Sequence, residues 1–127
     1  MKVLIVSENW TDAAAVAETL QRQGHEVLRE TTAAEGLRTA VKQRPGVLIV
    51  EQDLPDYPGA EILVRVRKIA PAMRVVMLVP FRFASLCRRL EEAGAETILA
   101  KSRPVTETFE ALKEILEAPV RRTNRAV

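Results

Sequence analysis

Short apolar runs and amphipathic stretches alternate five times along the chain. Strands are predicted at residues 2–6, 26–30, 47–50, 74–79 and 96–100. The first, third and fourth of these runs are almost continuously apolar, which is typical of parallel strands covered on both faces of a sheet. The pattern therefore predicts a sheet that lies inside the domain.

The stretches between the strands have apolar residues three and four positions apart, as on one face of a helix. Four predicted helices are defined in this way by Ala13, Val16, Ala17 and Leu20; by Leu37, Ala40 and Val41; by Phe83, Leu86, Cys87 and Leu90; and by Phe109, Leu112 and Leu116. Another helix is expected at about 59–70. Thr32 and Glu35 have the spacing of a capping box, while Gly24 and Pro119 stand where the first and last helices are expected to end.

Five strand–helix units of this length predict an α/β fold, a doubly wound parallel sheet in a three-layer α/β/α sandwich. The common flavodoxin-like strand order is 2-1-3-4-5, whose ligand crevice lies beyond the carboxyl ends of strands 1 and 3. The polar residues expected at this edge are Ser7, Glu8, Glu51, Asp53 and Lys101. This group is the candidate site.

Length and composition indicate how many domains the chain forms and in which compartment it is expected. The chain has 127 residues, 47% of them hydrophobic and 28% charged, as is ordinary for one globular domain. The opening apolar run is too short for a signal peptide, and no stretch approaches the ~20 apolar residues of a membrane span. The single cysteine, Cys87, excludes an internal disulfide, so a cytoplasmic protein is expected.

The basic pI of 9.0 comes from the end of the chain. Residues 119–127 contain three of the 19 basic residues and no acid, so the rest of the chain has 16 basic against 17 acidic residues. The body of the protein is not a basic surface. We therefore do not expect it to bind nucleic acid, and we interpret the segment as a solvated tail or linker.

Over residues 1–118 the sequence resembles the receiver domain of two-component response regulators. The resemblance is carried by KVLIV at 2–6, GHEV at 24–27, RPGVLIV at 44–50, Leu54-Pro55 followed by Gly59, and Gly94-Ala95-Glu96 leading to Lys101. It implies a domain at 1–118 with the tail at 119–127. It also implies a site that accepts phosphate on an aspartate after strand 3.

At that site the sequence departs from the family's pattern. The two acids that bind the metal in receivers correspond here to Ser7 and Glu8, and the phosphoaccepting aspartate corresponds to Glu51. The family's hydroxyl residue at the end of strand 4 corresponds to Val79, and its aromatic residue in strand 5 corresponds to Ile98. Lys101 matches the family's lysine, but Ser102 replaces the proline after it. The chain therefore resembles a degenerate receiver, or pseudo-receiver.

These departures predict a non-enzymatic signalling module that docks to partners independently of phosphorylation and has no cofactor. Three roles remain open for the acids: Glu51 as a built-in negative charge facing Lys101, Glu51 as a mere partner of Lys101, and Asp53 as a substitute phosphoacceptor. Weak Mg²⁺ binding by Glu8, Glu51 and Asp53 also remains open. The alternative function is a working phosphoacceptor receiver in a phosphorelay.

The resemblance also implies a partner face, formed by helix 4, strand 5 and helix 5. It would bind a signalling protein or a second copy, with homodimers as one outcome. Its charged residues are Arg88, Arg89, Glu91, Glu92, Lys113 and Glu114. A flavodoxin-like nucleotide binder is disfavoured, because the loop after strand 1 has no glycine and carries an acid where phosphates would bind.

Aromatic residues and the cysteine are expected to serve packing. The periodicity places Phe83 and Cys87 in the core, and Trp10 is expected to pack in its loop. Phe81 has two interpretations. It folds over Val79 and fills the space left by the missing hydroxyl, or it stays exposed as a partner contact.

Overall fold

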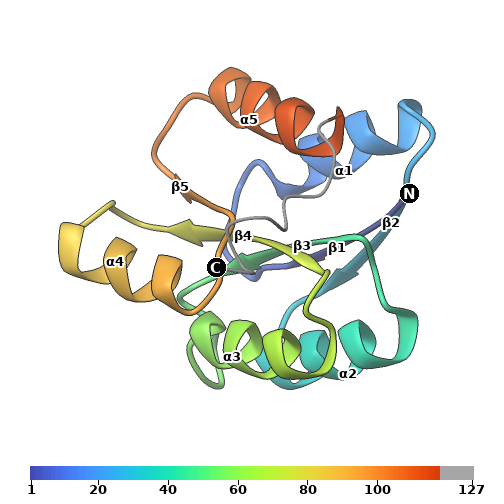
Figure 1. Cartoon of the computed structure of the whole chain (residues 1–127). Helices are drawn as coiled ribbons and strands as arrows, with labels where there is room; N and C mark the ends of the chain where they lie inside the picture. The colour runs from blue at the N-terminus through green and yellow to red at the C-terminus, as the bar shows by residue number, and fades with distance from the viewer. Residues whose placement is uncertain (118–127) are drawn as a thin grey trace.

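The structure, a computed structural model, describes residues 1–117 and contains five parallel strands in one sheet (Figure 1). The strands are β1 (Lys2–Val6), β2 (Glu26–Glu30), β3 (Val47–Glu51), β4 (Arg74–Val79) and β5 (Thr97–Ala100). Their order in the sheet is β2-β1-β3-β4-β5. The predicted fold and strand order are confirmed.

Helices cover both faces of the sheet. They are α1 (Ala13–Arg22), α2 (Ala33–Gln43), α3 (Gly59–Ile69), α4 (Ala84–Glu92) and α5 (Val105–Glu117). Figure 1 shows α1 and α5 on one face and α2, α3 and α4 on the other. This division follows from right-handed crossovers between parallel strands.

Two apolar clusters form the core, one on each face of the sheet. Alternate residues of each strand enter opposite clusters, so Leu48 and Val50 pack on one face and Val47 and Ile49 on the other. Every residue of β3 and β4 is buried. Each fully buried Val, Leu or Ile contributes about 1.5–3 kcal/mol, so these two strands anchor the fold.

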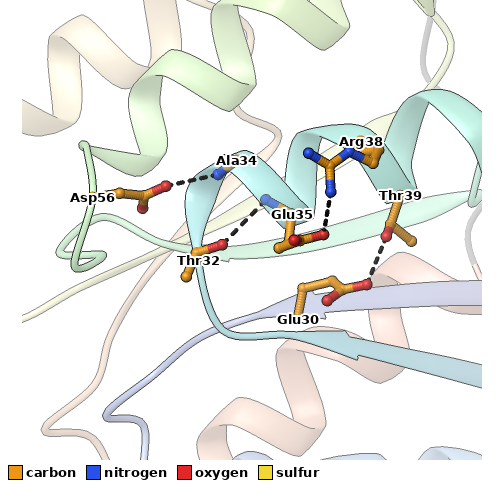
Figure 2. A network of polar contacts seen from close by, with 7 residues as sticks. All are labelled: Glu30, Thr32, Ala34, Glu35, Arg38, Thr39 and Asp56. Atoms are coloured by element: carbon orange, nitrogen blue, oxygen red, sulfur yellow. Dashed lines mark hydrogen bonds and ion pairs between the residues drawn. The ribbon is translucent and has the colours of Figure 1, made fainter.

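The second helix begins with a mixed set of caps (Figure 2). Thr32 accepts a hydrogen bond from the Glu35 N–H at 3.1 Å, as a capping box requires. The Glu35 carboxylate does not complete the box, because it pairs with Arg38 at 2.7 Å. Asp56, from the loop after β3, accepts instead from the N–H groups of Ala33 and Ala34 at 2.8 and 2.9 Å.

Two residues predicted for the core, Phe83 and Val41, are placed differently. Phe83 is the N-cap of α4 and its side chain is 61% exposed, because the helix begins one residue after it. Phe81 is 60% exposed, in agreement with the second of its two interpretations. Val41, near the end of α2, is 42% exposed. By contrast, Trp10 and Cys87 are buried as expected.

Two arginines at the amino edge of the sheet were not anticipated. Arg74 begins β4 with only 5% of its surface exposed, pairs with Glu96, and donates to the Ile115 carbonyl at 2.5 Å. Glu96 raises the pKa of the Arg74 guanidinium above its ordinary value, mainly through their hydrogen bond. Arg67 donates to the Gly94 carbonyl at 2.8 Å. Together they tie α3, β4, the α4–β5 turn and α5.

Candidate functional site

Glu51 ends β3 at the centre of the candidate site. Its side chain is fully buried, and its carboxylate accepts from three N–H donors. One oxygen, Oε1, accepts from the backbone N–H groups of Glu8 at 2.8 Å and Asn9 at 3.3 Å. The other, Oε2, accepts from the ammonium group of Lys101.

Lys101 follows β5 and reaches this site across the edge of the sheet. Its backbone N–H donates to the Val79 carbonyl at 2.8 Å, which extends the pairing between β4 and β5. Its side chain is 20% exposed, so the pair with Glu51 is largely shielded from water. Removing one member of such a pair leaves a buried charge, at a cost of about 3–5 kcal/mol.

The loop after β1 contributes backbone groups to the site. Ser7 is buried, and its backbone N–H donates to the Glu30 carbonyl at 3.0 Å. Glu8 contributes only its N–H to Glu51, while its exposed carboxylate accepts from the Asn9 side chain at 3.4 Å. A carboxylate at position 7 and the Glu8 side chain were the metal ligands that the family pattern required.

The residues at this edge fit Mg²⁺ poorly. Within residues 1–117, no group of three or more His, Cys, Asp or Glu side chains is placed to hold a metal ion. The weak site expected from Glu8, Glu51 and the backbone carbonyl of Asp53 has only two carboxylates, so it stays a prediction. Glu51 faces two N–H donors and the cation of Lys101, a setting that repels a metal.

Apolar side chains stand where the family pattern has a hydroxyl and an aromatic ring. Val79 is fully buried and Ile98 is 6% exposed, and both belong to the cluster beneath α2, α3 and α4. Neither can hydrogen-bond to a ligand at Glu51. They make this side of the site part of the core.

The loop after Glu51 returns close over the strand end. Gly59 is required there, since a Cβ at that position would lie 2.2 Å from the Glu51 carbonyl oxygen. The Gln52 side chain accepts from the Ala60 N–H at 3.1 Å, and the Gly59 N–H donates to the Gln52 carbonyl at 2.9 Å. Asp53 is exposed in this loop.

Sequence reasoning placed Ser7, Glu8, Glu51, Asp53 and Lys101 at one edge. The structure brings Glu51 together with Lys101 and with the backbone N–H of Glu8. Sequence reasoning missed the two N–H groups of Glu8 and Asn9, because backbone donors carry no residue signature. It also missed Asp56, whose only signal was its place between two prolines in the loop.

The acid Asp56 has a perturbed titration. Desolvation by neighbouring atoms raises the pKa of the exposed Asp56 carboxyl, but hydrogen bonds from backbone N–H groups outweigh this effect. The donors are those of Ala33, Ala34, Asp56 itself and Tyr57. The pKa of Asp56 is therefore lowered from its ordinary value of 3.8.

The charged residues predicted for the partner face all lie on the surface. They are Arg88, Arg89, Glu91 and Glu92 on α4, and Lys113 and Glu114 on α5. Within the part of the chain that the structure describes, none of them is held in an ion pair. They are available to a partner.

Known proteins share this sequence pattern. Relatives include the sporulation initiation phosphotransferase F of Bacillus subtilis, 25% identical over 91% of this chain and 93% of its own length. The transcriptional regulatory protein PrrA of Mycobacterium tuberculosis is 28% identical over 91% of this chain. The chain spans 49% of the length of PrrA.

Solved structures share the fold. A CheY-like receiver domain protein from Methanospirillum hungatei JF-1 matches with a TM-score of 0.82 and 26% identity, over 91% of this chain and 93% of its own. The non-phosphorylated HemR receiver domain of Leptospira biflexa matches with a TM-score of 0.87 at 17% identity, over 95% and 98% of the two chains.

The family assignment rests on these matches and on a family model. In residues 1–117 no helix combines the length and apolar character needed to cross a membrane. The model of the response regulator receiver domain matches residues 3–113. The chain belongs to the response regulator receiver domain family of two-component signalling.

Proposed function

We propose that this receiver domain is a non-enzymatic protein interaction module that works without phosphorylation. The observation that carries the proposal is the state of Glu51, whose buried carboxylate already accepts from two backbone N–H groups and from Lys101. The donors that would hold a phosphoryl group are thus engaged by the side chain itself.

Phosphoryl transfer to Glu51 is disfavoured by geometry and by missing groups. The extra methylene of glutamate displaces the carboxylate by about 1.5 Å relative to aspartate, and a misplacement of ~1 Å can lower a rate ~100-fold. Ser7 supplies no carboxylate to Mg²⁺, which requires near-ideal octahedral geometry. Val79 offers no hydroxyl to a phosphoryl oxygen, an interaction with a charged group of ~1.5–3 kcal/mol.

The burial of Glu51 favours a role as an internal counterion over a role as a displayed negative charge. Its side chain has no exposed surface for a partner to read. Val79 and Ile98 lack the groups that would relay its charge to α4 and α5. We therefore assign Glu51 to joining the β1–α1 loop, β3 and β5 in one conformation.

Intact mass spectrometry after incubation with acetyl phosphate and Mg²⁺ tests the proposal. The protein is expected to gain no phosphate, while a receiver domain that accepts phosphate, treated in parallel, gains it. A stoichiometric adduct on Glu51 or Asp53 would contradict the proposal.

A restored variant is the matched control for this assay. Ser7→Asp, Glu51→Asp and Val79→Thr together return three groups of the family's pattern to the site. This variant is expected to take up phosphate where the wild-type protein does not. If neither takes it up, the three departures are not the cause.

A working phosphoacceptor receiver is the second candidate. Lys101 keeps the family's position, and the relative from Bacillus subtilis is named a phosphotransferase. The same mass measurement separates the two candidates, since only the second gains phosphate on the wild-type chain.

The partner in our proposal is a protein, bound through α4, β5 and α5. The exposed charges there are of both signs, which favours specific pairing with a complementary surface. Because Glu51 is not switched, the association is expected to be constitutive. We place this module in the cytoplasm and assign it no nucleic acid.

A further inference from the structure

An exposed aromatic pair precedes α4. Phe81 and Phe83 are 60% and 61% exposed, the highest values among the large apolar side chains of residues 1–117. The Phe83 N–H donates to the Phe81 carbonyl at 3.1 Å, a tight turn that fixes the two residues relative to each other. Their ring centroids lie 5.9 Å apart at 58°, so the rings form one small apolar knob.

The surroundings of this aromatic pair are basic. Arg82 lies between the two rings in sequence, and Arg88 and Arg89 follow on α4, all three of them exposed. No acid occurs from residue 81 to residue 90. A surface that fits this knob therefore needs an apolar hollow with acidic residues near it.

Such a hollow exists on the opposite face of the same chain, between α1 and α5. It has a volume of about 130 Å³, a size that suits one aromatic ring, since an apolar cavity of ~150 Å³ holds a single benzene. Its apolar walls are Leu20, Phe109, Leu112 and Leu116. Gln23, Glu110 and Lys113 line it as well.

The helix beside this hollow is mainly acidic. Its exposed charged residues are Glu107, Glu110, Lys113, Glu114 and Glu117. Glu107 is paired with Arg103 at 3.1 Å, while Glu110 lines the hollow itself. Arginines around the aromatic pair and glutamates along α5 are thus complementary in charge.

We propose that a second copy of this chain is a partner, and that it binds head to tail: one ring of the Phe81–Phe83 knob of one copy enters the α1–α5 hollow of the next, while the other ring packs at its rim. Figure 1 shows α4 and the α1–α5 pair on opposite faces of the sheet, so one copy presents both surfaces at once. Because the two surfaces face opposite ways, a pair joined by this heterologous contact still has one free knob and one free hollow, so assembly continues into a ring or an open filament of more than two copies.

This inference goes beyond the proposed function, because it does not require an inert Glu51. Phosphate uptake in the mass assay would overturn the proposed function and leave the head-to-tail contact standing. Loss of the contact would leave the phosphorylation-independent site standing.

Sedimentation equilibrium of the full chain is the first test. The weight-average mass of the wild-type protein is expected to rise with concentration past twice the 14.1 kDa of a single copy. A protein that stays monomeric, or that stops at two copies, overturns the proposal.

Two single-surface variants sharpen the test. Phe81→Ser with Phe83→Ser removes the knob, and Glu110→Arg reverses the charge at the hollow, both at exposed positions. Each variant alone is expected to stay near 14.1 kDa. An equal mixture is expected to form a complex of two copies and no more, because it contains one intact knob and one intact hollow. A mixture that stays monomeric overturns the proposal.

Matched controls lie on α3. Val64→Ser with Ile69→Ser removes two apolar side chains that are 44% and 43% exposed, and Glu61→Arg makes the same charge change as Glu110→Arg. Both controls are expected to assemble as the wild type does. If they also abolish assembly, the association is non-specific and the proposal fails.

Discussion

In our proposal, the buried carboxylate of Glu51 stands where the family's pattern has the phosphoaccepting aspartate and serves as a partner of Lys101. Its two oxygens accept from the β1–α1 loop and from Lys101, so three segments of the carboxyl edge meet on one side chain. A buried ion pair is not by itself a source of stability, because both charges were better hydrated in the unfolded chain. Its effect is to make any rearrangement of this edge costly.

Lys101→Met tests that cost at the level of one residue. The change leaves the Glu51 carboxylate buried without its cation, so we expect the free energy of unfolding to fall by about 3–5 kcal/mol. Urea denaturation monitored by circular dichroism measures it.

The control for this prediction removes both charges. Glu51→Leu combined with Lys101→Met is expected to lose less stability than Lys101→Met alone, because no unpaired charge remains. Equal losses in the single and double variants would mean that Lys101 acts through packing rather than through Glu51.

At the scale of elements, Asp56 connects the β3–α3 loop to the start of α2. Its carboxylate accepts from the N–H groups of Ala33 and Ala34, the donors that the first turn of a helix leaves without partners. The negative charge also complements the positive end of the helix. The loop beside the candidate site and α2 are therefore held as one unit.

A pH dependence follows from the lowered pKa of Asp56. Because its pKa is lower in the folded than in the unfolded chain, its contribution is present above the ordinary value of 3.8 and is lost as the pH falls through the folded pKa. Asp56→Ala is expected to lower the melting temperature at neutral pH, and the difference from wild type is expected to shrink below pH 3.8. Melting curves at several pH values measure this.

Exposed Glu61 on α3 provides the comparison, since Glu61→Ala also removes one acid near a helix start. Its effect on melting is expected to be smaller, because no cap bond is lost. If the difference in melting temperature between the wild type and Asp56→Ala stays the same as the pH falls, the ionised carboxylate is not the source of the lost stability.

Element boundaries could be predicted from sequence where burial set the pattern. The continuous apolar runs of β1, β3 and β4 are typical of strands buried on both faces, and the predicted bounds of these strands agree with the structure to within one residue. The failures were at element ends. Phe83 fits the helical period of α4 but precedes its first residue, and Val41 fits that of α2 but lies near its exposed end.

Charged groups show the same limit. Periodicity alone indicates that Arg74 is an exposed polar residue at the start of a strand. In the structure Arg74 is buried, and it donates hydrogen bonds to the Glu96 carboxylate and the Ile115 carbonyl. The site could be located from strand order alone, whereas the backbone donors to Glu51 depend on how the β1–α1 loop turns.

At the scale of the whole molecule, the two positions from which the family's pattern relays a change at the site to the partner face hold the apolar residues Val79 and Ile98. A ligand shifts an equilibrium only through a difference in its affinity for two states. Val79 and Ile98, both buried, offer no second hydrogen-bonded arrangement between Glu51 and α4. We expect one dominant conformation.

Association should therefore respond to the surface and not to the site. Reversing the charges of Arg88 and Arg89 to glutamate is expected to weaken association by ten-fold or more, about 1.4 kcal/mol in binding free energy. Glu51→Gln is expected to leave it almost unchanged. Sedimentation measurements on both variants decide the matter: loss of association only in Glu51→Gln would make the carboxylate the working signal.

The contact between Arg74 and the last turn of α5 has a mechanical consequence. Arg74 begins β4, which lies between β3 and β5 in the sheet, and its guanidinium holds the Ile115 carbonyl and the Glu96 carboxylate together. A load applied at Glu117 would reach the sheet through this arginine instead of peeling α5 away turn by turn. In a pulling experiment with the load applied at Glu117, Arg74→Met is expected to lower the force at which α5 detaches. With the load applied at the amino-terminal end of the domain, the first unfolding force is expected to be the same in Arg74→Met and in the wild type.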